Sequence, residues 1–264
     1  MYKVIAALAL MLNQGSAAYL ENDHKVKDLT SLRYIDDLLA SGSGQFSDDQ
    51  LAILLNDIVQ RRNIHPSKIV VIDLRQESHL FANGIPFTIT GHSENTTKDY
   101  TSKNEKAIQT QLRTEKNIVL EPRKIKKEDG LKKDSRKIRK SVQLESAIIK
   151  TEEELCKNYG VQYWRLPVTA ISEKAAINEF IKFTSSLPKD TWIHIHCRGG
   201  EARTTAFLAI LEMMRFKNHS LYNILTRQHQ VGGNDLLKMP SQAERQQAVR
   251  DRLDVIRNTF DELH

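Results

Sequence analysis

The stretch His196-Cys-Arg-Gly-Gly-Glu-Ala-Arg-Thr-Thr205 carries the strongest fold signal in this chain of 264 residues. Residues 191–196 alternate in polarity as a strand does, and a helix is expected over residues 204–216. Between them, Cys197 and Arg203 stand six positions apart with two glycines in the interval. Such a loop can turn its backbone N–H groups inward and bind an anion beside a helix N-terminus. The sequence therefore predicts a phosphate-binding loop between a strand and a helix.

The residue types in this loop suit nucleophilic attack on a phosphate. A cationic setting lowers the pKa of a cysteine thiol, so Cys197 is the predicted nucleophile and Arg203 the clamp on two phosphate oxygens. Thr204 is expected to hydrogen-bond the sulfur, and His196 to order the loop. The other loop residues are predicted to line the phosphate: Arg198, Gly199, Gly200, Glu201 and Ala202. The alternative is a purely structural turn around a buried cysteine.

Outward from the loop, strands and helices alternate along the chain. Ser47 is expected to cap a helix at residues 48–62, and residues 69–72 form an apolar, β-branched run typical of a buried central strand. Pro167 is expected to end a strand at residues 161–166. Further helices are predicted from a cap at Thr151, from a cap at Ser172 to about residue 185, and at residues 221–230 and 242–263. This alternation predicts an α/β fold with a central twisted sheet flanked by helices.

Residues 96–150 interrupt this pattern and are predicted to form a small, basic, β-rich inserted lobe. Residues 118–120 and 141–149 are candidate strands on either side of a Lys-rich turn. Residues 121–140 contain ten Lys or Arg and four Asp or Glu, so this run alone carries the net charge of +6 of the whole chain. The run is either a solvated face or a contact for a polyanion. It has no aromatic residue to stack on bases, so nucleic-acid binding is not expected.

The N-terminus has the three-part pattern of a secretory signal. Lys3 precedes nine apolar residues at positions 4–12, and a small, polar run follows with a cleavage point near Ala17 or Ala18. Residues 1–18 are therefore predicted to be a signal peptide and residues 28–264 the folded domain, the alternative being a buried first strand or helix. We expect a protein that is secreted, periplasmic or delivered into a host.

Neither a membrane anchor nor a disulfide framework is expected. No stretch approaches the apolar length needed for stable membrane insertion. Cys156 and Cys197 are the two cysteines of the chain, too few for a set of disulfides, so Cys197 is better interpreted as a reactive thiol.

Several strings of the sequence resemble a known family. They are SGSGQFS at residues 41–47, DLRQESH at 73–79 with NGIP at 83–86, the loop at 196–205, and RQHQVGG at 227–233. In this order they are similar to the protein-tyrosine-phosphatase-like inositol phosphatases, the bacterial cysteine phytases. The resemblance implies a tyrosine-phosphatase-like fold and hydrolysis of a phosphorylated inositol such as phytate through a phosphocysteine intermediate. It implies no cofactor and no metal, and it places the family's small partial-barrel lobe where the basic insert lies.

The resemblance also suggests further substrate contacts. Asp73 and His79 belong to the DLRQESH string, and Arg245 stands near a family lysine that meets substrate. A densely phosphorylated ring suits a wide basic rim, for which the chain offers Arg198, Arg123, Lys124, Lys126, Lys127 and Arg245. Each of these cations is otherwise a solvated surface charge. The family's N-terminal substrate-contacting arginine has no clear counterpart before Ser41.

The general acid is where the sequence departs from the family. The family places an Asp directly after a Thr in the loop between a strand and a helix, and Ala170 stands there in this chain. An alkoxide leaving group needs a proton, and general-acid catalysis contributes about 10²–10⁴-fold. Glu173 on the same loop and Glu201 on the phosphate loop are the candidate substitutes.

Three functions stay open at this point. The first is an inositol polyphosphate phosphatase, and the second is a phosphatase acting on phosphotyrosine or on a phosphoinositide lipid. The third is an inositol-phosphate-binding protein that is catalytically weak or inactive because Ala170 replaces the acid. The oligomeric state is left open.

Overall fold

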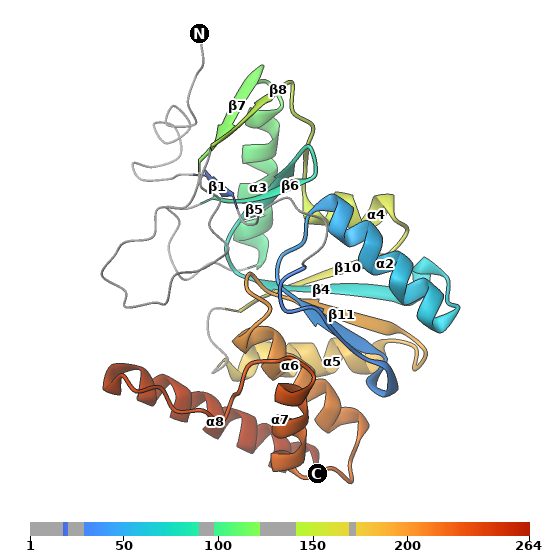
Figure 1. Cartoon of the computed structure of the whole chain (residues 1–264), viewed down its shortest axis with the longest axis vertical. Helices are drawn as coiled ribbons and strands as arrows, with labels where there is room; N and C mark the ends of the chain where they lie inside the picture. The colour runs from blue at the N-terminus through green and yellow to red at the C-terminus, as the bar shows by residue number, and fades with distance from the viewer. Residues whose placement is uncertain (1–17, 21–28, 90–97, 122–140, 169–172) are drawn as a thin grey trace.

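The computed structural model of the chain describes residues 18–20, 29–89, 98–121, 141–168 and 173–264, and in them five strands form the sheet that carries the loop (Figure 1). The sheet order is β10 (Gln162–Val168), β4 (Ile69–Arg75), β11 (Trp192–His196), β3 (Ala40–Ser43) and β2 (Arg33–Ile35). Two short 3-10 helices precede β3 and β4, namely η1 (Asp36–Leu38) and η2 (Pro66–Lys68). β10, β4, β11 and β3 run parallel, and β2 is antiparallel to β3. The carboxyl ends of the parallel strands therefore share one edge, where Cys197 follows β11.

Each face of this sheet has its own helical cover (Figure 1). One face packs against α2 (Asp48–Arg62) and α4 (Glu152–Asn158), and the other against α5 (Lys174–Ser186), α6 (Ala202–Arg215), α7 (Leu221–Gln230) and α8 (Ala243–Leu263). On β11, Trp192 belongs to the core with α2 and α4, whereas Ile193 and Cys197 belong to the core with α5 to α8. Because side chains alternate along a strand, His196 points to the α4 side and Cys197 to the α6 side.

A second, smaller core lies in a lobe beside the main sheet (Figure 1). Its sheet has the order β1 (Ala18–Leu20), β6 (Ile85–Ile89), β5 (His79–Ala82) and β9 (Ile149–Lys150), with α3 (Lys98–Leu112) packed on it. β7 (Asn117–Leu120) pairs with β8 (Val142–Glu145), as predicted for the strands that flank the basic run. Asn83 and Gly84 have φ of 50° and 80°, which makes the tight β5–β6 hairpin turn. β5 and β6 share this core although they precede residue 96.

Most local predictions agree with the structure. Ser47 and Thr151 cap α2 and α4 in capping boxes completed by Gln50 and Glu154. The predicted signal peptide falls on residues up to 17, which lie outside the described residues, and on Ala18, the first residue of β1. In the part of the chain that the structure describes, no helix has the length and apolar character to cross a membrane.

Pro167 does not end its strand, contrary to the prediction. β10 continues through it to Val168, with an irregular register against β4 between Arg165 and Val168. A proline lacks the N–H that a sheet ladder needs, but it is tolerated here because β10 stands at the edge of the described sheet. Ser172, the predicted cap of the next helix, lies outside the described residues, and Glu173 occupies the N-cap position of α5.

Candidate active site

The loop at residues 197–201 is shaped by the turn that follows β3. The N–H of Gln45 donates to the carbonyl of Arg198 at 3.1 Å. Gly200 has a φ of +70°, and a Cβ there would lie 2.4 Å from the backbone nitrogen of Gly44. Both the backbone conformation and the close approach of two chain segments therefore require glycine at position 200. The turn after β3 thus acts as a template for the loop.

The Cys197 thiol is buried at the start of this loop, with 3% of the residue exposed. Burial opposes ionisation, but the charge of Arg203 and hydrogen bonds from the Thr204 side chain and from the Thr204 and Gly200 backbone lower the pKa of Cys197. The hydroxyl of Thr204 also lies 3.4 Å from the carbonyl of Ser43. A thiolate surrounded by donors is the species that attacks phosphorus.

The guanidinium of Arg203 is held by hydrogen bonds to one carboxylate and two backbone carbonyls. Its Nη2 lies 3.2 Å from Oε1 of Glu77, and its Nη1 lies 3.3 Å from Oε2. Nη1 also donates to the carbonyls of Leu74 at 3.2 Å and Val168 at 2.9 Å. Burial favours the neutral form of Glu77, but the charges of Arg75 and Arg203 hold the pKa of this carboxyl well below its usual range. The guanidinium is therefore held in one orientation by contacts within the chain.

Arg33 of β2 supports the loop from another side, and the sequence alone did not reveal it. Its Nη1 donates to the carbonyl of Gly200 at 2.9 Å and its Nη2 to Oγ1 of Thr205 at 3.1 Å. Burial lowers the pKa of Arg33 to about 10, and the nearby Cys197 opposes this shift. Arg33 precedes Ser41, as the family's substrate-contacting arginine does, but it is 3% exposed and supports the loop from inside. The available signal for a buried Arg33 was its place two positions before the apolar Ile35, because residues two apart on a strand point to the same face.

Asp73 and His79, predicted to contact substrate, lie behind the loop in this structure, and that role stays a prediction. Both residues are fully buried. Asp73 accepts hydrogen bonds from the backbone N–H of Arg75 at 2.7 Å and from the hydroxyl of Tyr163 at 2.9 Å. Nε2 of His79 lies 2.9 Å from Oε2 of Glu152. Without exposed surface, the two residues join β4 and β5 behind the loop.

His196 also points away from the phosphate side of the loop. Its Nε2 lies 2.6 Å from Oε1 of Glu152, and its ring centroid lies 4.9 Å from that of Phe46. Burial opposes protonation, but the carboxylates of Glu152 and Asp73 raise the pKa of His196. That His196 orders the loop stays a prediction, and the contact with Glu152 gives it a physical basis.

The remaining predicted residues lie at the surface or outside the described residues. Arg198 is half-buried on the loop, and Glu201 is exposed at the N-cap position of α6. Glu173 is exposed at the N-cap of α5, and Arg245 is exposed in the first turn of α8. Outside the described residues lie Ala170 and the cations Arg123, Lys124, Lys126 and Lys127. The structure thus brings together Cys197, Arg203 and Thr204, and leaves the acid and the basic rim as predictions.

The string at residues 227–233 supports α6 from behind. Glu212, fully buried on α6, accepts hydrogen bonds from Nη1 of Arg227 at 3.0 Å and from Nε2 of Gln228 at 2.7 Å. A Cβ at Gly233 would lie 2.4 Å from the carbonyl of Gln228. These contacts fix the helix whose N-terminus follows the loop at residues 197–201.

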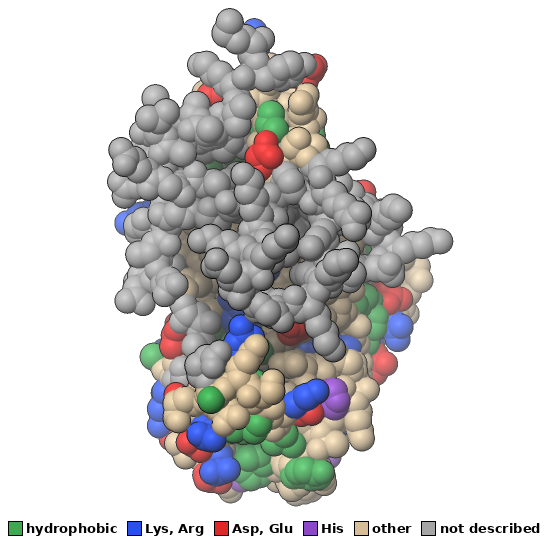
Figure 2. Space-filling view, turned by 60° about the vertical axis from the view of Figure 1, so that its left-hand side comes forward, with side chains coloured by type: hydrophobic (Ala, Val, Ile, Leu, Met, Phe, Trp, Pro, Cys, Tyr) green, Lys and Arg blue, Asp and Glu red, His purple; other side chains and the backbone are tan. Residues whose placement is uncertain are grey.

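Charges of both signs share the face drawn in Figure 2. Over its lower part, Lys and Arg side chains are interspersed with Asp and Glu. On the described part of this face the cations therefore do not form one broad patch. The basic rim stays a prediction, since four of its cations, Arg123, Lys124, Lys126 and Lys127, lie outside the described residues.

The fold is that of the protein-tyrosine-phosphatase-like phytases, as the resemblance predicted. The chain is similar to the tandemly repeated protein tyrosine phosphatase like phytase from Mitsuokella multacida, with a TM-score of 0.82 and 24% identity over 94% of this chain and 45% of that one. A phytase of the same class from Bdellovibrio bacteriovorus gives a TM-score of 0.72 and 23% identity over 94% of this chain and 89% of its own. A model of the protein-tyrosine-phosphatase-like phytase family, described as "Inositol hexakisphosphate", matches residues 72–215, more than half of the chain. The chain belongs to this family.

Two other relatives bear on ligands and setting. The structure of the protein-tyrosine-phosphatase-like myo-inositol phosphatase from Mitsuokella multacida in complex with myo-inositol-(1,3,4,5)-tetrakisphosphate gives a TM-score of 0.82 and 23% identity over 94% of this chain and 45% of that one. The effector protein hopD2 of Pseudomonas syringae pv. tomato is 26% identical over 167 residues, which are 60% of this chain and 34% of the effector. The chain thus spans less than half the length of each of these two proteins.

Proposed function

We propose that this chain is a cysteine-dependent phosphomonoesterase that acts on inositol polyphosphates such as phytate. The observation that carries the proposal is the Cys197 thiol, whose pKa is lowered in a loop where Glu77 already orients Arg203. Membership of the phytase family supports the substrate class. A polyanionic phosphoester is also what the Mitsuokella multacida relative holds in its complex.

In the proposed first step, the Cys197 thiolate attacks phosphorus, and the bond from phosphorus to the inositol oxygen breaks. Arg203 and the loop N–H groups stabilise the charge on the transferring phosphoryl oxygens. The inositol oxygen leaves with the electron pair of that bond and takes a proton from a general acid. In the second step, the carboxylate of the same acid takes a proton from water, and the water oxygen attacks phosphorus. The phosphorus–sulfur bond breaks, so inorganic phosphate leaves and the sulfur keeps the electron pair as the thiolate. The hydrogen bond from Thr204 stabilises the sulfur as it leaves.

In this scheme the proton donor is a carboxyl group elsewhere in the chain, because position 170 is an alanine. Glu201 stands at the N-cap of α6 on the loop itself, and Glu173 at the N-cap of α5, and both are exposed toward solvent. We expect one of the variants Glu201→Gln and Glu173→Gln to lower turnover of phytate by about 100-fold, the size of general-acid catalysis. Parent-like turnover in both variants would rule out both residues.

The direct test measures phosphate release from phytate and from a tyrosine phosphopeptide across pH. We expect the parent protein to act faster on phytate. Cys197→Ser is expected to abolish turnover and to keep phytate binding in calorimetry, because the clamp and the loop N–H groups remain. Full turnover by the serine variant would overturn the mechanism, and a preference for the phosphopeptide would overturn the substrate class.

Ala170→Asp tests whether the family's acid is missing or replaced. The substitution restores the Asp that the family places after the Thr, here Thr169. A rate gain of about tenfold or more is expected if the chain has no efficient donor of its own. An unchanged rate, together with a loss in Glu201→Gln or Glu173→Gln, would show that another carboxyl does the work.

We further propose that the protein is exported and cleaved before β1. The pattern at residues 1–18 supports this, and one relative carries the name of an effector. Cleavage after Ala17 leaves Ala18, which pairs with Ile89, in the lobe sheet. The mass of the protein recovered from a producing cell's periplasm or medium checks the cleavage point, and an uncleaved N-terminus there would contradict it.

A further inference from the structure

We propose that Glu152 is a positioning residue for the nucleophile, because its one buried carboxylate holds the chain on both sides of Cys197. The inference rests on the proposed function only in taking Cys197 as the nucleophile. Glu152 comes from the first turn of α4, 2% exposed, and it belongs to none of the strings that pointed to the phosphate loop.

The first contact holds the residue before the nucleophile. Oε1 of Glu152 lies 2.6 Å from Nε2 of His196, with both side chains fully buried. His196 is the last residue of β11 and is joined to Cys197 by a single peptide unit. A shift of the imidazole ring therefore moves the start of the loop.

The second contact holds the residue after the nucleophile. Oε2 of Glu152 accepts a hydrogen bond from Nε2 of Gln45 at 3.0 Å. The backbone N–H of the same Gln45 donates to the carbonyl of Arg198 at 3.1 Å. Oε1 of Gln45 is in turn held by Nη1 of Arg75 at 2.6 Å, which fixes the amide orientation. One carboxylate thus reaches the loop through His196 on one side and through Gln45 on the other.

The ion pair of Glu152 and His196 also acts on the ionisation of the Cys197 thiol. Burial opposes ionisation of Glu152, but His196 and His79 hold the pKa of its carboxyl well below the usual value, and Glu152 in turn raises the pKa of His196. His196 immediately precedes Cys197 in the chain, and Glu152 reaches its ring from α4. A protonated imidazole at that position favours the Cys197 thiolate, in addition to Arg203 and the hydrogen bonds from Thr204 and Gly200 that lower its pKa.

Other charged groups around the pair leave this sign unchanged. They are Asp73 and Arg75 of β4, His79 of β5, Arg165 of β10 and His194 of β11. Burial, followed by the charge of His196, keeps the pKa of His194 well below its usual value, so that ring stays neutral. Asp73 lies 3.7 Å from Nε2 of His196, farther than Glu152, and Arg165 neutralises it at 3.4 Å.

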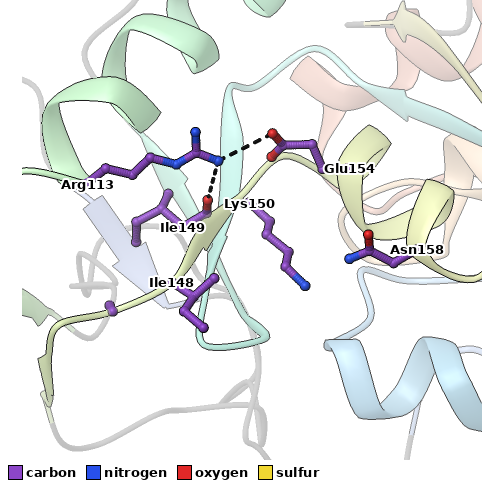
Figure 3. A pocket seen from close by; sticks show the side chains of 7 residues that line it. Arg113, Ile148, Ile149, Lys150, Glu154 and Asn158 are labelled. Carbon is purple, nitrogen blue, oxygen red and sulfur yellow. Dashed lines mark hydrogen bonds and ion pairs between the residues drawn. The ribbon is translucent and has the colours of Figure 1, made fainter.

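The turn that carries Glu152 is held from its outer side as well. Glu154, two residues on, accepts hydrogen bonds from Gln109 at 2.5 Å and from Nη2 of Arg113 at 3.3 Å. Figure 3 shows Arg113 reaching both Glu154 and the carbonyl of Ile149 at the rim of a pocket of about 400 Å³. The lobe helix α3 therefore clamps the turn whose inner side holds the nucleophile.

The test measures the pKa of Cys197 from the rate of alkylation by iodoacetamide against pH. Mass spectrometry of the modified peptide separates Cys197 from Cys156. In Glu152→Gln we expect this pKa to rise by about one unit, which leaves about tenfold less thiolate at pH values below it. Glu153→Gln is the matched control, since it makes the same change at the exposed neighbouring residue, and its profile is expected to equal that of the parent.

A second pair of variants separates positioning from a general loss of structure. In a His196→Asn background, Glu152→Gln is expected to add little to the shift, because the charge effect passes through His196. Glu152→Asp keeps the charge but draws the carboxylate back from the ring, so an intermediate profile is expected. It carries the test if Glu152→Gln does not fold.

The outcomes distinguish a failure of the positioning role of Glu152 from a failure of Cys197 as the nucleophile. A parent-like profile in whichever Glu152 variant folds, or equal shifts with and without His196, would overturn the positioning role. An ordinary thiol pKa for Cys197 in the parent would instead overturn the proposed nucleophile, whatever Glu152 does.

Discussion

The orientation of Arg203 depends on the ionisation of Glu77. The pKa of Glu77 is held well below its usual range, so its pairing stabilises the fold above the unfolded value of about 4.3 and is lost as pH falls through the lower folded value. We expect Glu77→Gln to lower the free energy of unfolding by about 1–2 kcal/mol at neutral pH. The difference from the parent shrinks as the pH falls below about 4. Urea unfolding across pH measures it, and a difference independent of pH would contradict the pairing; Glu145→Gln, at an exposed residue, is the control.

At the scale of residues, the sequence predicted what lies within one segment. Cys197, Arg203 and Thr204 are visible because their roles follow from spacing in a single loop. Arg33 and Glu152 act on the same loop from segments far away in the chain, and no spacing rule connects them with it. Asp73 and His79 show the converse limit, since a string shared with a family does not distinguish a substrate contact from a buried support, and both side chains are buried.

At the scale of elements, Gly200 and Gly160 offer a matched pair of substitutions. Both have positive φ, +70° and +69°, but a Cβ at Gly200 meets backbone atoms of Gly44 and Ser43, whereas at Gly160 nothing lies within 4 Å. Gly160→Ala is expected to lower the free energy of unfolding by about 1 kcal/mol and to leave turnover unchanged. Gly200→Ala is expected to cost more and to lower phosphate release by about 100-fold or more, because the loop N–H groups move. Thermal unfolding and turnover check both variants, and equal behaviour would mean that the turn after β3 does not shape the loop.

Helix α3 shows why some elements escape sequence patterns. Its buried side includes Ile108 and Leu112 but also Thr101, Glu105 and Gln109, which stand four positions apart. Spacing of four is helical, yet these side chains are polar and are buried through hydrogen bonds instead of apolar packing. Apolar periodicity therefore predicts a lobe of strands there and does not indicate the helix. The continuation of β10 through Pro167 was missed for a related reason, since an edge position is a property of the assembled sheet.

At the scale of the whole molecule, Glu105 joins the lobe to the main sheet. Its Oε1 accepts from Nη1 of Arg165 at 2.6 Å and from the N–H of His79 at 2.8 Å, and it is 5% exposed. Removing one partner of a buried ion pair leaves an uncompensated charge, so Glu105→Gln is expected to lower the free energy of unfolding by about 3 kcal/mol. Hydrogen exchange should show the loss first in α3 and β5. Glu115→Gln, just beyond α3, is the control, and equal stability of the two variants would show that the lobe is held elsewhere.

The lobe boundary itself was only partly visible in the sequence. The change of composition near residue 96 marks the basic run, not the core, because the lobe takes β5 and β6 from a segment that reads as part of the main domain. Strand pairing across the chain, such as Phe81 with Lys150, decides which segments share a core.

The two cysteines lie on opposite faces of the main sheet, and this placement determines how the protein reacts with an oxidant. Cys156 packs in the core with α2, where burial raises its thiol pKa, whereas Cys197 belongs to the core on the other face of the sheet and has a lowered pKa. Peroxide reacts with thiolates, so oxidation to a sulfenic acid falls on Cys197. Because the sheet lies between the two sulfurs, Cys197 cannot form a disulfide with Cys156. A sulfenic acid at Cys197 is therefore reversed by an external thiol or protected by condensation with a backbone nitrogen, and further oxidation to the sulfinic acid inactivates the thiol irreversibly.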